Sequence, residues 1–504
     1  MSPFTPPAPR AVPFRTADDL RVAAGARPVV ETRPVEEARA ISTTNACRMC
    51  MPLGACLAFA GLEGTVPFLH GGQGCATYIR RYLISHFNEP LDIGSSSFGE
   101  ASTVFGGEAD LHQGIRNVVA SYRPALVGVA TTCLAETIGE DVPRMLGRLR
   151  AGATDPVATH PAATGAPVTG AATIDTALPP LVAVSTPSYA GTHADGYQAA
   201  VAAVLQALAE PGPTTNDLVL LPGMVSCADL RHLRELVAVH GLEATVLPDY
   251  ADSLDAPASA EYHRLRPGGT PLSEVVRCGR ARAALTLGGL VSPGTPSGGE
   301  LLAGRFRVPH HALPLPVGLR LTDAFLDLLG EWGGRDPSGA VAAERGRLVD
   351  AYVDGHKYLA GRRAVVFGDE DLVVALTAFL GEVGVKVVVC ASGGRSGRLR
   401  RTLAEHTPEL PADVLVLEDA DFAQIDAAAG EAAPDLLVGH SKGYPTARRL
   451  GVPLVRVGLP VHDRLGGQRL MHLGYRGTQQ LFDRIVNTVI ERAQDSSPVG
   501  YAYM

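Results

Sequence analysis

Three cysteines stand in settings that could ligate a metal. Cys50 opens the run Cys-Met-Pro-Leu-Gly-Ala, Cys75 ends the run His-Gly-Gly-Gln-Gly-Cys, and Cys133 follows two threonines directly after an apolar run. Glycines beside a thiol allow the backbone to approach a bulky ligand. Since ligands gather at the carboxyl ends of strands in open parallel sheets, we expect Cys133 to serve in ligation rather than as a buried small residue.

The spacing of these thiols favours an iron–sulfur cluster over a zinc ion. Cys50 and Cys75 are 25 residues apart, and Cys75 and Cys133 are 58 apart, whereas a zinc knuckle takes its ligands from close pairs. Thiolates drawn from three separate loops suit a larger object whose irons prefer soft sulfur ligands. An ordinary cubane takes about four cysteines, and only three are placed on loops of this kind. The shortfall predicts that a second chain completes the ligand set.

The remaining cysteines have simpler interpretations. Cys47 forms a Cys-x-x-Cys pair with Cys50, which alone could be a dithiol or half of a zinc site in an interaction protein. The pair lacks the following helix that is typical of dithiol redox sites. It also lacks the second pair of ligands that a zinc site needs. Four isolated cysteines are predicted to be buried small apolar residues: Cys56, Cys227, Cys278 and Cys390.

The elements that must position these residues follow a β–α rhythm. Short β-branched apolar runs end in small or polar turns and are followed by helical periodicity. Such a pattern predicts parallel sheets covered by helices on both faces. The predicted strands lie at 125–130, 181–185, 218–221, 244–247, 283–287, 364–367, 385–389, 414–417, 436–438 and 454–457.

We therefore predict an α/β fold of three doubly wound domains with mainly parallel sheets. An N-terminal arm (1–40) precedes a cluster-binding domain (41–212) that carries a low-complexity insertion at 151–180. A middle domain (213–320) and a C-terminal domain (321–504) follow. The Gly- and Pro-rich segment 290–316, with its pair His310-His311, is predicted to be a linker with a solvated loop.

Composition narrows the class of protein. The chain has 504 residues, of which 46% are hydrophobic and 19% charged, so it is a folded chain rather than a disordered one. It contains no apolar run of about 18 residues, and its start does not resemble a signal peptide. A net charge of −8 disfavours nucleic acid as the main partner. Eight cysteines are too few for a disulfide scaffold, so we expect a cytoplasmic protein with no membrane contact.

An ordered series of motifs resembles the β subunit of nitrogenase component 1, together with the related cofactor-assembly scaffold and nitrogenase-like reductases. The C-terminal third carries further matches, whereas the middle region and the 151–180 insertion match poorly. The motifs are Cys50-Met-Pro-Leu-Gly-Ala, His70-Gly-Gly-Gln-Gly-Cys75, His86-Phe-Asn-Glu-Pro90, Val104-Phe-Gly-Gly107, Thr131-Thr-Cys-Leu-Ala-Glu136, Thr186-Pro-Ser188, Asp435-Leu-Leu-Val-Gly-His-Ser441, Gly451-Val-Pro-Leu-Val-Arg-Val-Gly458 and His462-Asp-Arg464.

The resemblance implies a cofactor and its ligands. In that family an 8Fe–7S P-cluster lies at each boundary between an α-type and a β-type subunit of an α₂β₂ assembly. By motif, this chain's share is Cys50, Cys75 and Cys133, with Ser188 as a further iron ligand in the oxidised state; the alternative for Ser188 is a cap or turn residue after Pro187. Gly74, with Gly71 and Gly72 beside it in the sequence, would let the backbone lie close to the cluster.

The resemblance also implies a role. The α-type subunit holds the substrate-reducing cofactor, and neither Cys227 nor Cys278 has the sequence context of its ligand. We therefore expect no catalytic residue in this chain, which would relay electrons from an ATP-dependent iron protein that binds transiently. No P-loop is present. The substrate would be dinitrogen or a carbon–sulfur bond, as in methylthio-alkane reductases.

An alternative function is the β-like subunit of a scaffold for cofactor biosynthesis, with an interfacial 4Fe–4S cluster. The segments 45–50 and 78–86 look more like scaffold-type sequences, whereas retention of all three cysteines favours the reductase. Glu136 and His193 are predicted to be outer or surface residues. The pair His440-Ser441 and the run His462-Asp463-Arg464 are predicted to make inter-subunit or domain-closing contacts.

Overall fold

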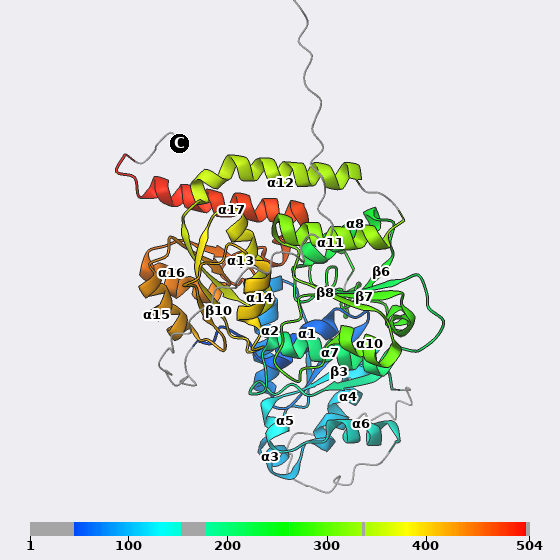
Figure 1. Ribbon diagram of the computed structural model, residues 1–504. Coiled ribbons are helices and arrows are strands. Elements are labelled where there is room, and N and C mark those ends of the chain that lie inside the picture. The colour runs from blue at the N-terminus through cyan, green and yellow to red at the C-terminus, as the bar shows by residue number, and fades with distance from the viewer. Residues whose placement is uncertain (1–44, 153–177, 262, 335–337, 500–504) are drawn as a thin grey trace, which may run out of the picture. The chain divides into compact units, whose positions relative to one another are not determined.

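The computed structural model describes residues 45–152, 178–261, 263–334 and 338–499. The arm predicted for 1–40 lies outside the described residues, as does most of the insertion predicted for 151–180. The described ranges form three parallel sheets flanked by helices (Figure 1). The predicted α/β class with doubly wound parallel sheets is confirmed.

The first sheet carries the loops of the three candidate cysteines. Its strand order is β2-β1-β3-β4, and all residues of β1 and β3 are buried, as expected for central strands. The strands are β1 (Thr65–His70), β2 (Gly94–Ser95), β3 (Leu126–Thr131) and β4 (Leu181–Val184). The helices are α1 (Met51–Ala60), α2 (Gln73–Phe87), α3 (Glu100–Phe105), α4 (Glu108–Tyr122), α5 (Cys133–Thr137), α6 (Val142–Arg150) and α7 (His193–Leu208).

The middle sheet has the order β6-β5-β7-β8. Its strands are β5 (Leu218–Leu221), β6 (Ala244–Val246), β7 (Ala283–Leu287) and β8 (His310–Leu313). Its helices are α8 (Cys227–Val239), α9 (Leu272–Arg277), α10 (Gly298–Phe306) and α11 (Gly318–Trp332), with the 3₁₀ turn η2 (Cys278–Arg280).

The linker predicted at 290–316 is wrong, because α10 and β8 lie within it. β8 is an edge strand of the middle sheet and is only half-buried. Its sequence therefore lacks the continuous apolar run by which the other strands were predicted. His310 is not solvated as a loop residue would be: its Nε2 lies 2.9 Å from Thr286 Oγ1 on the neighbouring strand β7.

The C-terminal sheet has the order β11-β10-β9-β12-β13. Its strands are β9 (Arg363–Gly368), β10 (Lys386–Ser392), β11 (Leu415–Leu417), β12 (Leu436–Gly439) and β13 (Leu454–Arg456). Its helices and 3₁₀ turns are α12 (Ser338–Leu359), α13 (Glu370–Glu382), α14 (Leu399–His406), α15 (Phe422–Ala432), η3 (Ser441–Gly443), α16 (Tyr444–Leu450), η4 (Gly467–Arg469) and α17 (Gly474–Asp495). The long helices α12 and α17 lie side by side (Figure 1).

The three sheets share one apolar core. Leu69 of β1, Leu220 of β5 and Val366 of β9 all belong to the same cluster of buried side chains. Cys56, Cys227, Cys278 and Cys390 are buried in it, as predicted. Within the described ranges, no helix combines the length and apolar character that crossing a bilayer requires.

Candidate metal centre

Three of the four predicted ligands follow neighbouring strands of the first sheet. Cys75 lies in the first turn of α2 after β1, and Cys133 is the first residue of α5 after β3. Ser188 lies in the loop after β4. β1, β3 and β4 are adjacent and parallel, so their carboxyl ends meet at one edge of the sheet. Neighbouring strands are about 4.8 Å apart, and this edge therefore brings the three side chains into one region.

Cys50 is fixed by the helix that it precedes. It occupies the N-cap position of α1, and all ten residues of α1 are buried. α1 packs closely on α7. Gly54 makes this approach possible, since any side chain there would overlap the carbonyl of His193. Met51, the first residue of α1, donates its N–H to Ser188 Oγ at 3.2 Å. The start of α1 is therefore tied to the loop after β4.

The four predicted ligands influence one another. Ser188 donates its backbone N–H to Cys133 Sγ at 3.2 Å. Burial raises the pKa of Cys50, its hydrogen bond with Ser188 lowers it, and the charge of Cys133 raises it further. Burial and the charges of Cys50 and Cys133 raise the pKa of Cys75. Thiolates that repel one another at this edge would be stabilised by a shared positive centre.

The edge is open on one side. Cys75 is exposed, whereas Cys50 and Cys133 are half-buried. A β-carbon added to Gly72 or Gly74 would meet no atom of the described residues within 4 Å. Gly71 differs from the prediction, because the space beside it is filled by the Thr132 side chain. Within the described ranges, no three His, Cys, Asp or Glu side chains surround one point as a single metal ion requires.

Cys47 does not join the other thiols. Its side chain is buried, with Sγ 3.7 Å from Nε2 of His440, and it belongs to a second apolar cluster beside the C-terminal sheet. Burial raises the pKa of the Cys47 thiol to about 12 and lowers that of His440 to about 3. The pair is therefore neutral, and nothing in its position supports a dithiol or zinc site with Cys50.

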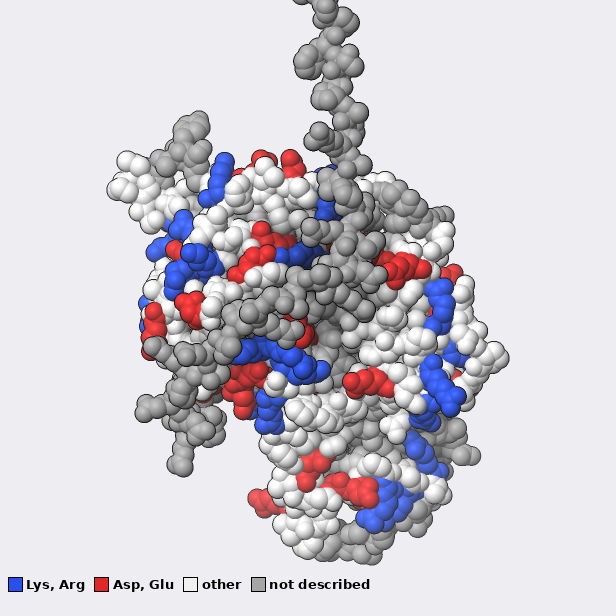
Figure 2. Space-filling model, viewed as in Figure 1, with Lys and Arg blue, Asp and Glu red and all other residues white. Residues whose placement is uncertain are grey.

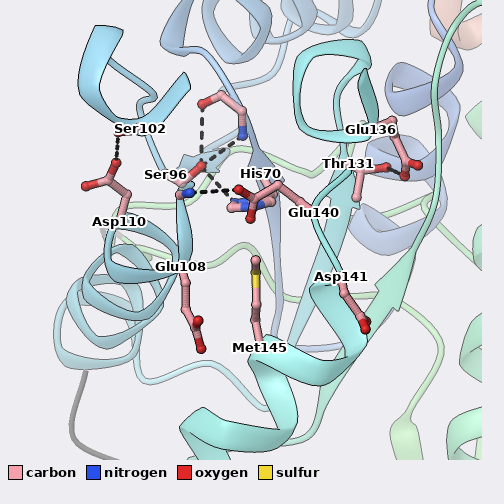
Figure 3. A network of polar contacts seen from close by, with 12 residues as sticks. His70, Ser96, Ser102, Glu108, Asp110, Thr131, Glu136, Glu140, Asp141 and Met145 are labelled. Atoms are coloured by element: carbon pink, nitrogen blue, oxygen red, sulfur yellow. Dashed lines mark hydrogen bonds and ion pairs between the residues drawn. The ribbon is translucent and has the colours of Figure 1, made fainter. Parts of the chain in front are cut away.

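A network of polar contacts around His70 holds the loops at the sheet edge together (Figure 3). His70, the last residue of β1, is buried, with Nδ1 3.1 Å from Ser96 Oγ and Nε2 3.3 Å from Glu140 Oε2. Burial lowers the pKa of His70 more than Glu140 raises it. Glu140 also accepts the N–H of Gly107 at 2.8 Å. The network links the loop that leads to Cys75 with the turn that follows α5.

Glu136 lies within the same region rather than free on the surface. Its carboxylate accepts hydrogen bonds from the hydroxyls of Thr131, at the end of β3, and Ser185, just after β4. The Thr131 contact is drawn in Figure 3. Glu136 therefore holds the loops of Cys133 and Ser188 together.

Buried polar contacts join the first region to the C-terminal region and hold the C-terminal loops together. His193 is buried, not at the surface, with Nε2 3.0 Å from Asp369 Oδ1. Burial alone would raise the pKa of Asp369, but the charge of His193 lowers it. Ser441 donates its hydroxyl to Asp463, which also binds Arg456.

Two features were not predicted from the sequence. Lys442 donates from Nζ to the carbonyls of Ala46 and Arg48, close before Cys50. Val104 and Phe105, at the end of α3, are each 73% exposed. The signal for the first is composition, because lysine is rare in this chain; the signal for the second is an apolar pair directly before Gly106 and Gly107.

The family of the chain follows from its sequence. Residues 50–490 match the family described as nitrogenase component 1 type oxidoreductase. The chain belongs to this family, which confirms the resemblance and makes it an oxidoreductase subunit.

Individual relatives are of two functional kinds. The chain is 31% identical over 449 residues to the nitrogenase molybdenum-iron protein beta chain of Methanococcus maripaludis, covering 88% of this chain and 93% of that one. It is 31% identical over 453 residues to the nitrogenase iron-molybdenum cofactor biosynthesis protein NifN of Rhodobacter capsulatus, covering 89% and 91%. The solved structure of nitrogenase Cp1 at pH 6.5 matches with a TM-score of 0.84 and 28% identity, covering 94% of this chain and 99% of that one.

Proposed function

We propose that this chain is the β-type subunit of a nitrogenase-like reductase and holds half of an iron–sulfur cluster of the P-cluster type. Cys50, Cys75 and Cys133 would be its ligands, and Ser188 a further one. The observation that carries the proposal is geometric: Cys75, Cys133 and Ser188 follow adjacent strands at one sheet edge, and Ser188 binds both Cys133 Sγ and the first residue of the helix that Cys50 caps.

The open side of this edge supports a shared cluster. The exposed thiol of Cys75 and the free space at Gly72 and Gly74 leave room for a bulky group and a second polypeptide. Three thiols serve only part of a cluster of this kind. The partner would be a homologous α-type subunit in an α₂β₂ heterotetramer, which supplies the remaining ligands.

When bound, such a cluster supplies one-electron storage between an ATP-dependent iron protein and the cofactor of the α-type partner. That cofactor would reduce dinitrogen or a carbon–sulfur bond. The exposed pair Val104 and Phe105 supports transient docking of a protein at this end of the first sheet. Positive and negative side chains alternate in small groups on the face drawn in Figure 2, which favours protein partners over nucleic acid. We place the assembly in the cytoplasm.

A second candidate function is the β-like subunit of a cofactor-biosynthesis scaffold with an interfacial 4Fe–4S cluster. The observation that favours it is the similarity to NifN, which equals the similarity to the beta chain in identity and nearly in coverage. The two functions differ in the cluster that the interface holds.

The test is to purify the chain with its α-type partner under anaerobic conditions and to measure iron, sulfide and electron paramagnetic resonance (EPR) spectra. The reductase predicts an eight-iron cluster at each interface, with a signal of its own after oxidation. A complex with the spectrum of a 4Fe–4S cluster alone would exclude the reductase and support the scaffold. A complex that contains zinc but no iron would exclude both.

A further inference from the structure

Lys442 connects the C-terminal sheet with the segment that enters the metal centre. It lies in η3, just after β12. Its Nζ donates to the carbonyl of Ala46 and, at 3.2 Å, to that of Arg48. Both carbonyls belong to the short stretch before Cys50, so the ammonium fixes the backbone that leads to this thiol.

The ammonium of Lys442 has no carboxylate partner. It is partly buried, and within the described part of the chain it forms no ion pair. Burial lowers the pKa of Lys442, and the charges that raise it are those of Cys47 and Cys50. A cation that is partly removed from water is stabilised by a negative neighbour.

Only one of the two thiols can supply that charge. Cys47 is fully buried beside His440, and burial raises its pKa to about 12, which keeps it neutral. Cys50 becomes negative when its thiolate ligates a metal. The ligating form of Cys50 would therefore supply a negative charge within electrostatic reach of Lys442.

The neighbouring arginine already has a carboxylate partner. Arg48 forms an ion pair with Asp419. Lysine is also scarce, since the chain contains it only at positions 357, 386 and 442. A compact ammonium, rather than the arginine used almost everywhere else, therefore contacts the backbone just before Cys50.

We propose that Lys442 is a positioning residue for the metal centre, which fixes the backbone before Cys50 and raises the reduction potential of the cluster through its positive charge. The reduced cluster carries one more negative charge than the oxidised form, so a nearby cation stabilises it. This inference rests on the proposed iron–sulfur function.

The experiment compares midpoint potentials in the complete complex with the α-type partner, by redox titration monitored by EPR. Lys442→Met removes the charge and keeps the length of the side chain. We expect the ratio of reduced to oxidised cluster at a fixed potential to fall about tenfold, which is about 59 mV for one electron. Lys442→Arg keeps the charge, and its midpoint should stay close to that of the wild type.

Lys386→Met is the matched control. Lys386 is the exposed first residue of β10, whereas Gly393, which lies against Cys47, follows the last residue of that strand. The same substitution there should leave the potential unchanged. An unshifted midpoint in a fully loaded Lys442→Met complex would overturn the inference, as would an equal shift in Lys386→Met.

Iron content separates this inference from the proposed function. A wild-type complex without iron and sulfide would overturn the proposed function itself. A loaded wild type with unshifted Lys442 variants would overturn only the role of Lys442. If Lys442→Met does not assemble, Lys442→Gln replaces it: the midpoint of Lys442→Gln must fall below that of Lys442→Arg, and equal midpoints would refute the effect of charge.

Discussion

At the scale of single residues, the surroundings of a cysteine determine its role. Cys75 is exposed at the sheet edge, and its pKa responds to two other thiols. Cys390 is fully buried in β10, with Sγ 3.4 Å from Thr377 Oγ1, and burial raises its pKa to about 12. The first is available as a ligand, whereas the second is a small apolar residue of the core.

These surroundings predict opposite outcomes for the same substitution. Cys75→Ala should abolish cluster binding and weaken the association with the α-type partner, because it removes a ligand of the cluster that the two subunits would share. Cys390→Ala should cost about 1 kcal/mol of stability and leave iron content unchanged. Iron analysis and gel filtration of the purified complexes check both. Full cluster content in Cys75→Ala would show that the ligand assignment is wrong.

At the scale of elements, the turn between β1 and α2 decides where Cys75 lies. Gly71 adopts a φ of +151°, and a side chain there would overlap the Thr132 hydroxyl. A β-carbon added to Gly74, three residues on, would meet no atom within 4 Å in the described ranges. The turn is therefore packed within the chain at its start and open towards the metal centre at its end.

Two alanine substitutions separate folding from cluster binding at this turn. Gly71→Ala should destabilise the chain by about 2 kcal/mol or more, through backbone strain and the overlap with Thr132. Gly74→Ala should leave thermal unfolding unchanged but reduce iron content, because its side chain would occupy the space of the cluster. Thermal unfolding and iron analysis of both variants are the measurements. Normal iron content in Gly74→Ala would argue against close approach of the backbone at this position.

Elements with strong local signals were predictable and those without were not. The strands predicted at 218–221 and 283–287 coincide with β5 and β7, because uninterrupted apolar runs mark them. β1 was not among the predicted strands, since Pro67 removes a ladder donor in its middle. The candidate ligands were found by motif. The pair Cys47–His440 was not, because 393 residues separate its members and only the fold brings them together.

At the scale of the whole molecule, the core shared by the three sheets also buries an ionisable side chain, Glu370. Glu370 begins α13 and is 3% exposed. Its Oε1 accepts the N–H of Ser396 at 3.2 Å, and its Oε2 has no hydrogen-bond partner within the described residues. Burial raises the pKa of Glu370 from 4.5 to about 7.

This shift predicts a pH dependence of stability. The folded state keeps the proton of Glu370 up to about pH 7, whereas the unfolded chain loses it near 4.5. The folded state binds more protons in this window, so its contribution to stability falls as pH rises from about 4.5 to 7 and then levels off. Glu370→Gln should remove this dependence and stabilise the complex by about 2 to 3 kcal/mol at pH 8.

Unfolding temperatures of the complex between pH 5 and 8 measure the effect. Glu405→Gln, on the exposed surface of α14, is the control and should follow the wild type. A Glu370→Gln variant with the same pH profile as the wild type would refute the assignment.

The scarcity of lysine gives the chain a built-in reporter. Amine-reactive reagents find only three lysine side chains: Lys357 and Lys386 lie on the surface, and Lys442 contacts the backbone just before Cys50. Labelling at the first two measures general reactivity, so the modification of Lys442 relative to them, followed by mass spectrometry, reports how the chemical environment of that one thiol changes as the complex matures.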